Sequence, residues 1–81
     1  MSNESSQEVT EKLYRKYRKV MLTRLETAHE LGISVQTLDR LKKVALGPKY
    51  TKNGKENRNG AVRYSIEAVA EYIITHEVMT A

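Results

Sequence analysis

TRLETAHELGISVQTLDRLKK, residues 23–43, carries the start and stop signals of two short helices around one glycine. Thr23 and Glu26 have the spacing of a capping box, in which each side chain accepts a hydrogen bond from a backbone amide at the start of a helix. Gly32 is suited to end that helix, because glycine adopts a positive φ without steric cost. The stretch therefore predicts a first helix over residues 24–31.

A second helix is expected directly after this glycine. Ser34 is a good N-cap for a helix over residues 35–44, and Leu38 and Leu41 fall on its inward face. Gly47-Pro48 ends it, because proline lacks the amide that a continuing helix needs. Two short helices joined by a glycine-containing turn are typical of a helix-turn-helix.

Helical periodicity also precedes this pair. Apolar residues recur at helical spacing between residues 8 and 20, and bases occupy most positions between them, which predicts a basic N-terminal helix. The polar residues 1–7 are expected to form a disordered tail. Met21-Leu22 interrupts the helical pattern and is expected to be a short extended segment.

A β-hairpin and a last helix are expected after the second helix. Val62 and Tyr64 alternate with Ala61 and Arg63, as in a strand with one buried face, and Tyr50 is expected on the same side. The polar residues 52–60 are expected to form a long loop between the strands. Ser65 is expected to cap a helix over residues 66–77, followed by a tail at 78–81.

The chain has 81 residues, enough for one small domain with a modest core. The inward positions of the expected elements predict that core to consist of Leu25, Ala28, Leu31, Ile33, Leu38, Leu41, Val62, Tyr64, Val69 and Ile73.

The charge is unevenly distributed along the chain. It carries 14 Lys and Arg against 10 Asp and Glu, a net charge of +4. Residues 9–24 hold six bases and one acid, and residues 34–64 hold eight bases and two acids. Two such blocks favour a one-sided positive surface, for which nucleic acid is the natural partner. The alternative left open is a solvated surface with uneven charge.

Several kinds of chemistry are excluded by what the sequence lacks. Without cysteine it has no disulfides, thiolate zinc sites or cysteine nucleophiles. Its two histidines, His29 and His76, are far apart, which argues against a histidine-rich metal site. It has no glycine-rich phosphate loop and no Ser/His/Asp arrangement that indicates activation. We therefore expect neither an enzyme, nor a cofactor, nor a small-molecule substrate.

No apolar run approaches the ~20 residues that cross a bilayer. The polar start of the chain lacks the apolar region of a secretory signal. We therefore expect a cytoplasmic protein without a membrane partner.

The segment MLTRLETAHELGISVQTLDRLKK, followed by GPKY and VRYSIEAVAEYI, resembles the excisionases and AlpA-type regulators of the MerR-like winged-helix group. The resemblance covers residues 20–74. It rests on Met21-Leu22-Thr23 before the first helix, Leu31-Gly32 at its end and Arg40 in the second helix. Val62-Arg63-Tyr64 also matches, since relatives place an arginine before an aromatic residue there. The polar insert 52–60 departs from the usual compact wing, and the basic helix 8–20 is extra.

The resemblance implies a fold that is mainly α with a small β-hairpin, a winged helix-turn-helix with an extra N-terminal helix. Residues 21–77 would form the DNA-binding domain. It implies sequence-specific binding of double-stranded DNA, as an excisionase that sets the direction of recombination or as a transcriptional regulator of a phage or another mobile element. Implied partners are a site-specific recombinase (an integrase) and further copies of the chain on tandem sites. A nucleoid-associated, bacterial or phage-encoded protein is expected.

In such a protein the second helix enters the major groove. Gln36 is expected to pair with adenine and Arg40 with guanine, each worth about 1–3 kcal/mol of discrimination. For Asp39, an ion pair with Lys42 or Lys43 is favoured over a contact with cytosine. The predicted contact residues of this helix are Ser34 and Thr37 (phosphate or capping), Val35 (a thymine methyl), Gln36, Asp39, Arg40 and Lys43.

The wing and the N-terminal half supply further candidate contacts. Arg63, held on a strand, is expected in the minor groove or on the backbone, with a surface arginine as the alternative. The N-terminal helix either adds phosphate contacts, packs on a neighbouring protomer, or only covers the core. The predicted wing contacts are Lys49, Lys52, Lys55, Arg58 and Arg63, and the candidate backbone contacts are Thr23, Arg24, Arg15 and Lys19.

Two other function classes remain open from the sequence. A DNA-binding assembly module is one, because the small terminase subunit of lambdoid phages has a similar winged-helix layout. A protein-interaction adaptor on the same scaffold is the other. A steep loss of DNA affinity with salt would separate DNA binding from the adaptor.

Overall fold

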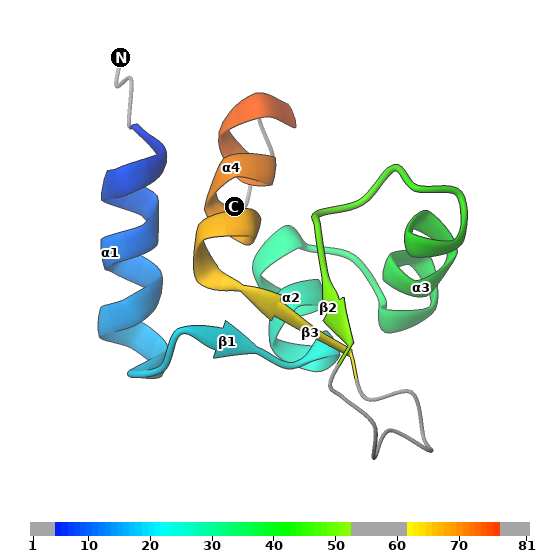
Figure 1. Cartoon of the computed structure of the whole chain (residues 1–81), viewed down its shortest axis with the longest axis horizontal. Helices are drawn as coiled ribbons and strands as arrows, with labels where there is room; N and C mark the ends of the chain where they lie inside the picture. The colour runs from blue at the N-terminus through cyan, green and yellow to red at the C-terminus, as the bar shows by residue number, and fades with distance from the viewer. Residues whose placement is uncertain (1–4, 53–61, 77–81) are drawn as a thin grey trace.

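The computed structural model describes residues 5–52 and 62–76, which form a mainly helical domain with a small antiparallel sheet (Figure 1). α1 and α4 stand together at one end of the molecule, α3 lies at the other end, and α2 and the sheet lie between them. In chain order the elements are α1 (Ser6–Tyr17), β1 (Met21–Leu22), α2 (Arg24–Leu31), α3 (Val35–Lys43), β2 (Thr51–Lys52), β3 (Val62–Ser65) and α4 (Ile66–His76).

Helix α1 begins earlier and ends earlier than the predicted range 8–20. Ser5 is its N-cap and forms a capping box with Glu8: the Glu8 amide donates to Ser5 Oγ at 3.2 Å, and the Ser5 amide donates to Glu8 Oε1 at 3.0 Å. The prediction of a disordered tail is therefore wrong at residues 5–7. The helix ends at Tyr17 because Arg18 adopts a left-handed conformation, with φ 58°.

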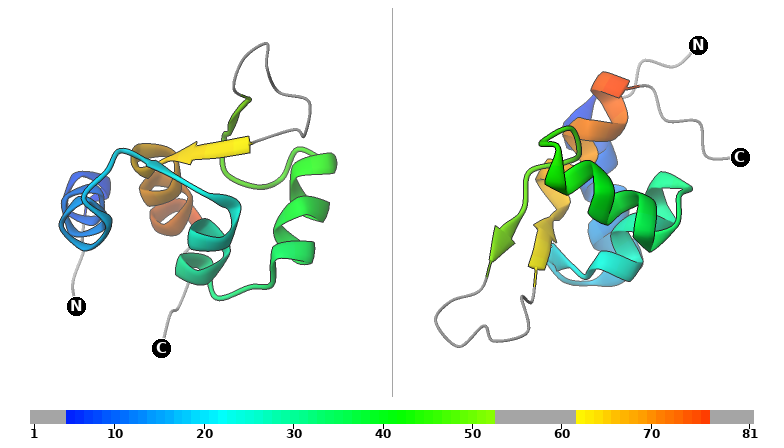
Figure 2. Two further views of the ribbon diagram at one scale, coloured as in Figure 1. Left: turned by 90° about the horizontal axis from the view of Figure 1, so that it is seen from below. Right: turned by 90° about the vertical axis from the view of Figure 1, so that its right-hand side faces the viewer.

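α1 lies along α4, and the two helices stand side by side in Figure 1 and in the left view of Figure 2. Val9 and Leu13 of α1 are buried against the common core. The N-terminal helix is thus part of the same domain, which agrees with the predicted alternative that it covers the core.

The capping signals of α2 and α3 act as predicted. Thr23 and Glu26 form the reciprocal capping box of α2, and Gly32 ends that helix with φ 72°. The Ile33 amide then donates to the Ala28 carbonyl at 3.0 Å. Ser34 Oγ accepts from the amide three residues on and starts α3. The chain therefore turns sharply at Gly32, and α2 and α3 pack against each other.

The sheet joins the hairpin to the segment before α2. β3 is the central strand, with β1 on one side and β2 on the other, all antiparallel. Leu22 pairs with Tyr64, and Thr51 pairs with Arg63. The ring centroids of Tyr50 and Tyr64 are 6.3 Å apart, as expected for side chains on one face. The predicted extended segment and hairpin strands are confirmed, whereas the predicted loop lies mostly outside the described residues.

Ser65 joins the sheet to α4. Its Oγ accepts a hydrogen bond from the Ala68 amide at 3.0 Å, so the predicted N-cap is confirmed. The described helix ends at His76, whose ring stacks on Tyr72 with centroids 3.9 Å apart.

The core differs from the predicted set most clearly around α2, and three other predicted core residues, Ile33, Leu41 and Ile73, are only half-buried. Leu25 was predicted to be buried, but 71% of it is exposed, and Thr27 is fully buried instead. Leu22, absent from the predicted set, is also fully buried. The cause is the sheet: β1 and β3 cover the side of α2 that carries Thr27 and leave the other side in solvent. The buried apolar residues are Val9, Leu13, Leu22, Ala28, Leu31, Leu38, Val62, Tyr64, Ile66, Val69 and Ala70.

Candidate nucleic-acid interface

Three polar side chains occupy the outer face of α3. Gln36, Arg40 and Lys43 are four and three residues apart, so they lie on one side of the helix. All three are exposed, and none forms a hydrogen bond or ion pair with another described residue. Leu38, on the opposite side, is fully buried and holds the helix on the core. The outer face of α3 is therefore free to contact a partner.

Three other residues predicted as contacts on α3 are engaged within the fold. Ser34 Oγ accepts from the Thr37 amide at 3.1 Å and donates to Thr37 Oγ1 at 3.0 Å, so both residues serve the helix start. Val35 is half-buried and packs against the core, which turns it away from the position needed to touch a base.

Asp39 pairs across the turn and not along its own helix. Arg24 Nε donates to Asp39 Oδ1 at 3.1 Å, and Arg24 Nη2 donates to Asp39 Oδ2 at 2.8 Å. The predicted pair with Lys42 or Lys43 is wrong, because the Arg24 guanidinium on α2 donates one hydrogen bond to each oxygen of the Asp39 carboxylate. The hydrogen bond to Asp39 raises the pKa of Arg24.

This ion pair has two consequences for the interface. It neutralises the one acidic side chain on α3, so the remaining charge of that helix comes from bases. It also occupies Arg24, which was a candidate for backbone contacts. Thr23 is occupied as well, because its hydroxyl caps α2.

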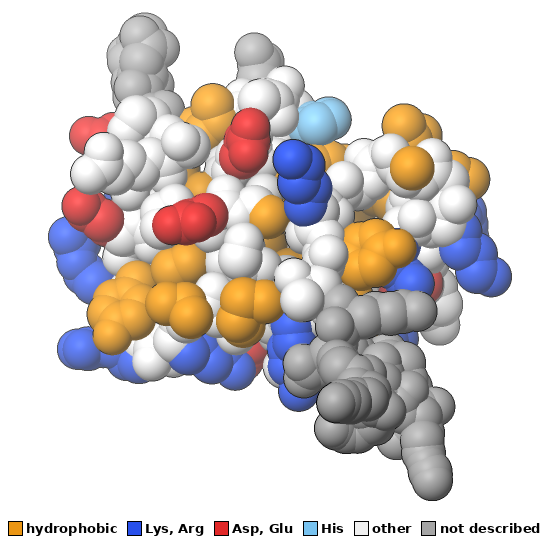
Figure 3. Space-filling model, in the orientation of Figure 1, with side chains coloured by type: hydrophobic (Ala, Val, Ile, Leu, Met, Phe, Trp, Pro, Cys, Tyr) orange, Lys and Arg blue, Asp and Glu red, His pale blue; other side chains and the backbone are white. Residues whose placement is uncertain are grey.

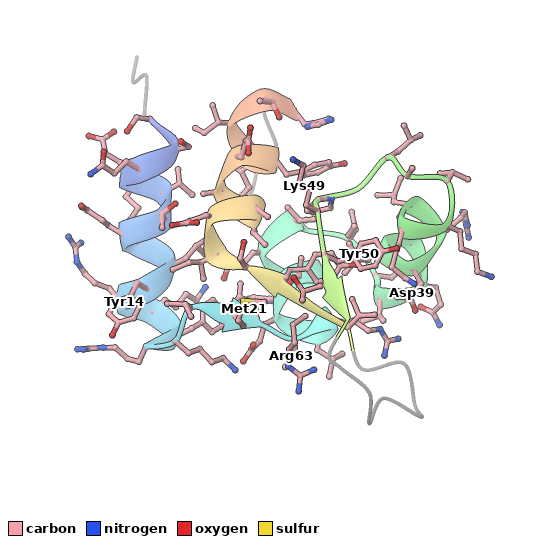
Figure 4. All side chains as sticks on the ribbon, in the orientation of Figure 1. Tyr14, Met21, Asp39, Lys49, Tyr50 and Arg63 are labelled. Atoms are coloured by element: carbon pink, nitrogen blue, oxygen red, sulfur yellow. The ribbon has the colours of Figure 1, made fainter. Side chains whose placement is uncertain are left out.

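Of the predicted hairpin contacts, Lys49 and Arg63 have described side chains, and these two lie apart. Figure 4 shows Arg63 below β3, at the edge of the molecule nearest the hairpin, and Lys49 beside α4 at the opposite end of the hairpin. Arg63 is half-buried, and its Nη1 donates to the Val62 carbonyl at 3.4 Å. Lys52 is on β2, whereas Lys55 and Arg58 lie outside the described residues. Arg63 is therefore a half-buried base on the central strand of the sheet, and both readings predicted for it remain predictions.

Bases near the end of α1 pair with glutamates of α2. Lys16 Nζ is 2.7 Å from Glu30 Oε2, and Lys19 Nζ is 3.0 Å from Glu26 Oε1. The Tyr17 hydroxyl also donates to Glu30. Lys19 is thus engaged, which weakens its case as a backbone contact.

These pairs shift the acidity of the groups involved. The hydrogen bond from the Thr23 amide, together with Lys19, lowers the pKa of Glu26. Partial burial alone would raise the pKa of Glu30, but hydrogen bonds from Lys16 and Tyr17 outweigh it and lower that pKa. The ionised form of both carboxylates is therefore favoured, and the ion pairs hold the end of α1 on α2.

Arg15 and Arg18 are exposed near the same end of α1 and have no partner among the described side chains. Arg15 was a predicted backbone contact, and Arg18 was missed. The sequence signal for Arg18 was its place in the basic block, but nothing local indicated the left-handed turn that projects it.

The charges separate on the visible face of the molecule. Figure 3 shows basic side chains along the lower edge, beneath α1 and the sheet, and others on the right over α3. Acidic side chains lie higher, over α1 and α4. The basic edge and the outer face of α3 border the hairpin from two sides, an arrangement suited to a long anionic partner.

Comparison with protein-family models, with curated proteins and with solved structures gives no match to this chain. Within residues 5–52 and 62–76, no helix has the length and apolar character of a membrane crossing. The same residues contain no cluster of three or more side chains suited to hold a metal ion.

Proposed function

We propose that this chain is a sequence-specific DNA-binding protein with a winged helix-turn-helix fold, of the excisionase or AlpA-regulator type. α3 is the recognition helix, and the hairpin of β2 and β3 is the wing. The observation that carries the proposal is the unpaired row of Gln36, Arg40 and Lys43 on a helix that is capped at Ser34 and anchored by Leu38.

The dimensions of α3 suit the major groove of B-form DNA. An α-helix with its side chains is about 10–12 Å across, and the major groove is about 12 Å wide, so the groove admits one helix such as α3. Arg40 has the planar fork that pairs with guanine O6 and N7, and Gln36 has the amide that pairs with adenine. Lys43, about one turn beyond Arg40 and two turns beyond Gln36, extends the row to a phosphate or a base edge.

The remaining bases supply contacts that carry no base specificity. Arg63 is placed to reach the backbone or the minor groove beside the wing. Arg15 and Arg18 are placed to meet phosphates at the other end of the molecule, along the basic edge seen in Figure 3. Asp39 is excluded from this proposal as a reader of cytosine, because Arg24 holds both of its oxygens.

The protein performs no chemistry in this proposal. It acts by occupying its site, in several copies where sites are in tandem, and by bending the duplex. A bent complex would direct a recombinase or block a promoter. The alternatives are a terminase-like assembly module, which binds DNA through the same face, and an adaptor that binds protein only.

The test is selection of duplexes from a random-sequence pool, followed by fluorescence anisotropy of the selected duplex over a range of salt concentrations. We expect a preference for one sequence and a log–log slope of affinity against salt near −5, for about six phosphate contacts. Failure to enrich any sequence, together with an affinity that ignores salt, would overturn the proposal and favour the adaptor.

A further inference from the structure

The segment between α3 and β2 carries three of the exposed large hydrophobic side chains of the domain within seven residues. Val44, Leu46 and Tyr50 are 56%, 63% and 45% exposed, although all three are large and apolar or aromatic. They follow directly on the basic end of α3. Large exposed apolar side chains near one another mark interaction sites more often than scattered ones do.

Tyr50, together with other residues of the same segment, lines a hollow of about 310 Å³ in the surface. Its volume is at the lower end of the range for ligand-binding pockets, enough for one or two inserted side chains. Its lining residues are Lys42, Ala45, Gly47, Pro48, Lys49 and Tyr50.

The backbone around the hollow is held in place. The Leu46 amide donates to the Leu41 carbonyl at 2.9 Å, which folds the segment back on α3. Gly47 sits so close to Leu41 that a Cβ would lie 3.3 Å from the Leu41 Cβ. Ala45 keeps a left-handed conformation, with φ 59°, which is costly for a residue with a Cβ. The hollow is therefore a formed feature of the fold.

The chemistry of the hollow is cationic and aromatic. Lys42 and Lys49 both line it, and Lys42 Nζ lies 5.1 Å from the centre of the Tyr50 ring. No carboxylate is among its described lining residues. A ligand that fits this site carries negative charge next to an apolar group.

The hollow lies apart from the proposed DNA interface. With about 100° of rotation per residue, Lys42 points roughly 120° away from the row of Gln36, Arg40 and Lys43. Figure 4 places Lys49 and Arg63 at opposite ends of the hairpin. Exposed aliphatic side chains such as Leu46 also gain nothing from phosphates, so DNA is a poor occupant for this surface.

We propose that this surface docks a protein partner through an acidic peptide segment. An aliphatic or aromatic side chain of the peptide enters the hollow beside Tyr50, a second one packs on the exposed Leu46 of the adjoining chain, and neighbouring carboxylates pair with Lys42 and Lys49. The contact is small, so the complex is weak and transient and is set by charge and by one apolar anchor. It operates independently of DNA binding and gives the domain a second, protein-directed face.

The test uses the full-length, isotope-labelled chain and a synthetic ten-residue peptide in which pairs of glutamates alternate with single leucines. We expect the amide signals of residues 44–50 to shift on titration, while those of Gln36 and Arg40 in the proposed DNA interface stay in place. A control peptide with serine in place of leucine should bind several-fold more weakly. A second control with lysine in place of glutamate should not bind.

Two variants assign the effect to this surface. Lys42→Glu should weaken the acidic peptide about tenfold, and Leu46→Ser should weaken it several-fold, because each removes one of the two parts of the contact. Leu46→Ser should leave the affinity for a selected DNA duplex unchanged, because Leu46 is outside the DNA interface. Unchanged amide spectra of the free variants would show that both still fold.

Four results would overturn the proposal. These are no shift at millimolar peptide, shifts spread equally over all exposed bases, equal binding of the serine control, and a duplex that shifts residues 44–50 more than Gln36 and Arg40. Shifts of residues 44–50 that depend on protein concentration without peptide would assign the surface to a second copy of the chain instead. If the chain binds the peptide but no DNA, the proposed function fails and the docking proposal stands, because the peptide titration contains no DNA.

Discussion

Arg24 in the first turn of α2 grips Asp39 in the middle of α3 through two parallel hydrogen bonds, of 3.1 and 2.8 Å. The pair spans the turn at Gly32 and joins two helices that otherwise meet through apolar side chains. Because each prong of the guanidinium meets one carboxylate oxygen, the contact fixes direction as well as distance. The orientation of α3, and with it the row of Gln36 and Arg40, depends partly on this brace.

The strength of this brace is measured by a double-mutant cycle. Arg24→Ala and Asp39→Ala, singly and together, should give a coupling free energy of about 0.5–1 kcal/mol in urea unfolding. The value is modest because both side chains are more than one-third exposed. A coupling of zero would mean that the pair does not brace the helices.

Gly32 and Ala45 share a left-handed backbone conformation but differ in side chain, so they make a matched pair of tests. Gly32→Ala should lower the free energy of unfolding by about 1 kcal/mol, because no atom blocks the new Cβ and only backbone strain remains. Ala45→Gly should raise it by about 0.5 kcal/mol, because relief of strain exceeds the added chain entropy. Urea unfolding measures both, and changes of the same sign would contradict the assigned conformations.

Two leucines near the start of α2 test the observed core against the predicted one. Leu22→Ala should cost about 2–5 kcal/mol, since Leu22 is fully buried and its removal leaves a cavity. Leu25→Ala, the control, should cost about 0.5 kcal/mol or less, since Leu25 is mostly in solvent. Thermal unfolding of the two variants measures both losses of stability. A larger loss for Leu25→Ala than for Leu22→Ala would contradict the observed core and favour the predicted one.

The two glutamates of α2 that pair with lysines at the end of α1 predict that the free energy of unfolding depends on pH. Glu26 and Glu30 have pKa values below the usual 4.5, so the unfolded chain binds more protons in mild acid. Their contribution to stability is complete above the unfolded pKa and is lost as the pH falls through the folded pKa. Glu30→Gln should therefore flatten the decline of the free energy of unfolding below about pH 5. Urea unfolding of both proteins at each pH measures the two slopes. Equal slopes for the variant and the parent would contradict the expected contribution of Glu30.

Local signals predicted most of the backbone. Thr23, Gly32, Ser34 and Ser65 act within three or four residues of themselves, and the structure has all four in the expected roles. The same kind of signal was present but unread at Ser5, where a capping box starts α1 before the apolar pattern begins. These elements were predictable because their causes are short-range.

The errors arose where distant segments meet. Leu25 was predicted as core because apolar spacing on a short helix fits two faces, and only the sheet of β1 and β3 selects the face with Thr27. Asp39 was expected to pair along α3 because spacing reveals only neighbours on one helix, whereas Arg24 is 15 residues away. The hollow beside Lys42 likewise depends on a fold-back of residues 44–50 that no local pattern indicated.

The most direct test of the DNA-reading role of α3 compares three proteins: the parent, Arg40→Ala and Arg15→Ala. The affinity of each is measured for the selected duplex and for every single-base-pair variant of that duplex. We expect Arg40→Ala to lose about 1–3 kcal/mol on the selected duplex and to lose discrimination at one base pair. Arg15→Ala, the control, should weaken all duplexes alike. If Arg40→Ala also weakens all duplexes alike, or changes none, α3 does not read bases and the central claim is wrong.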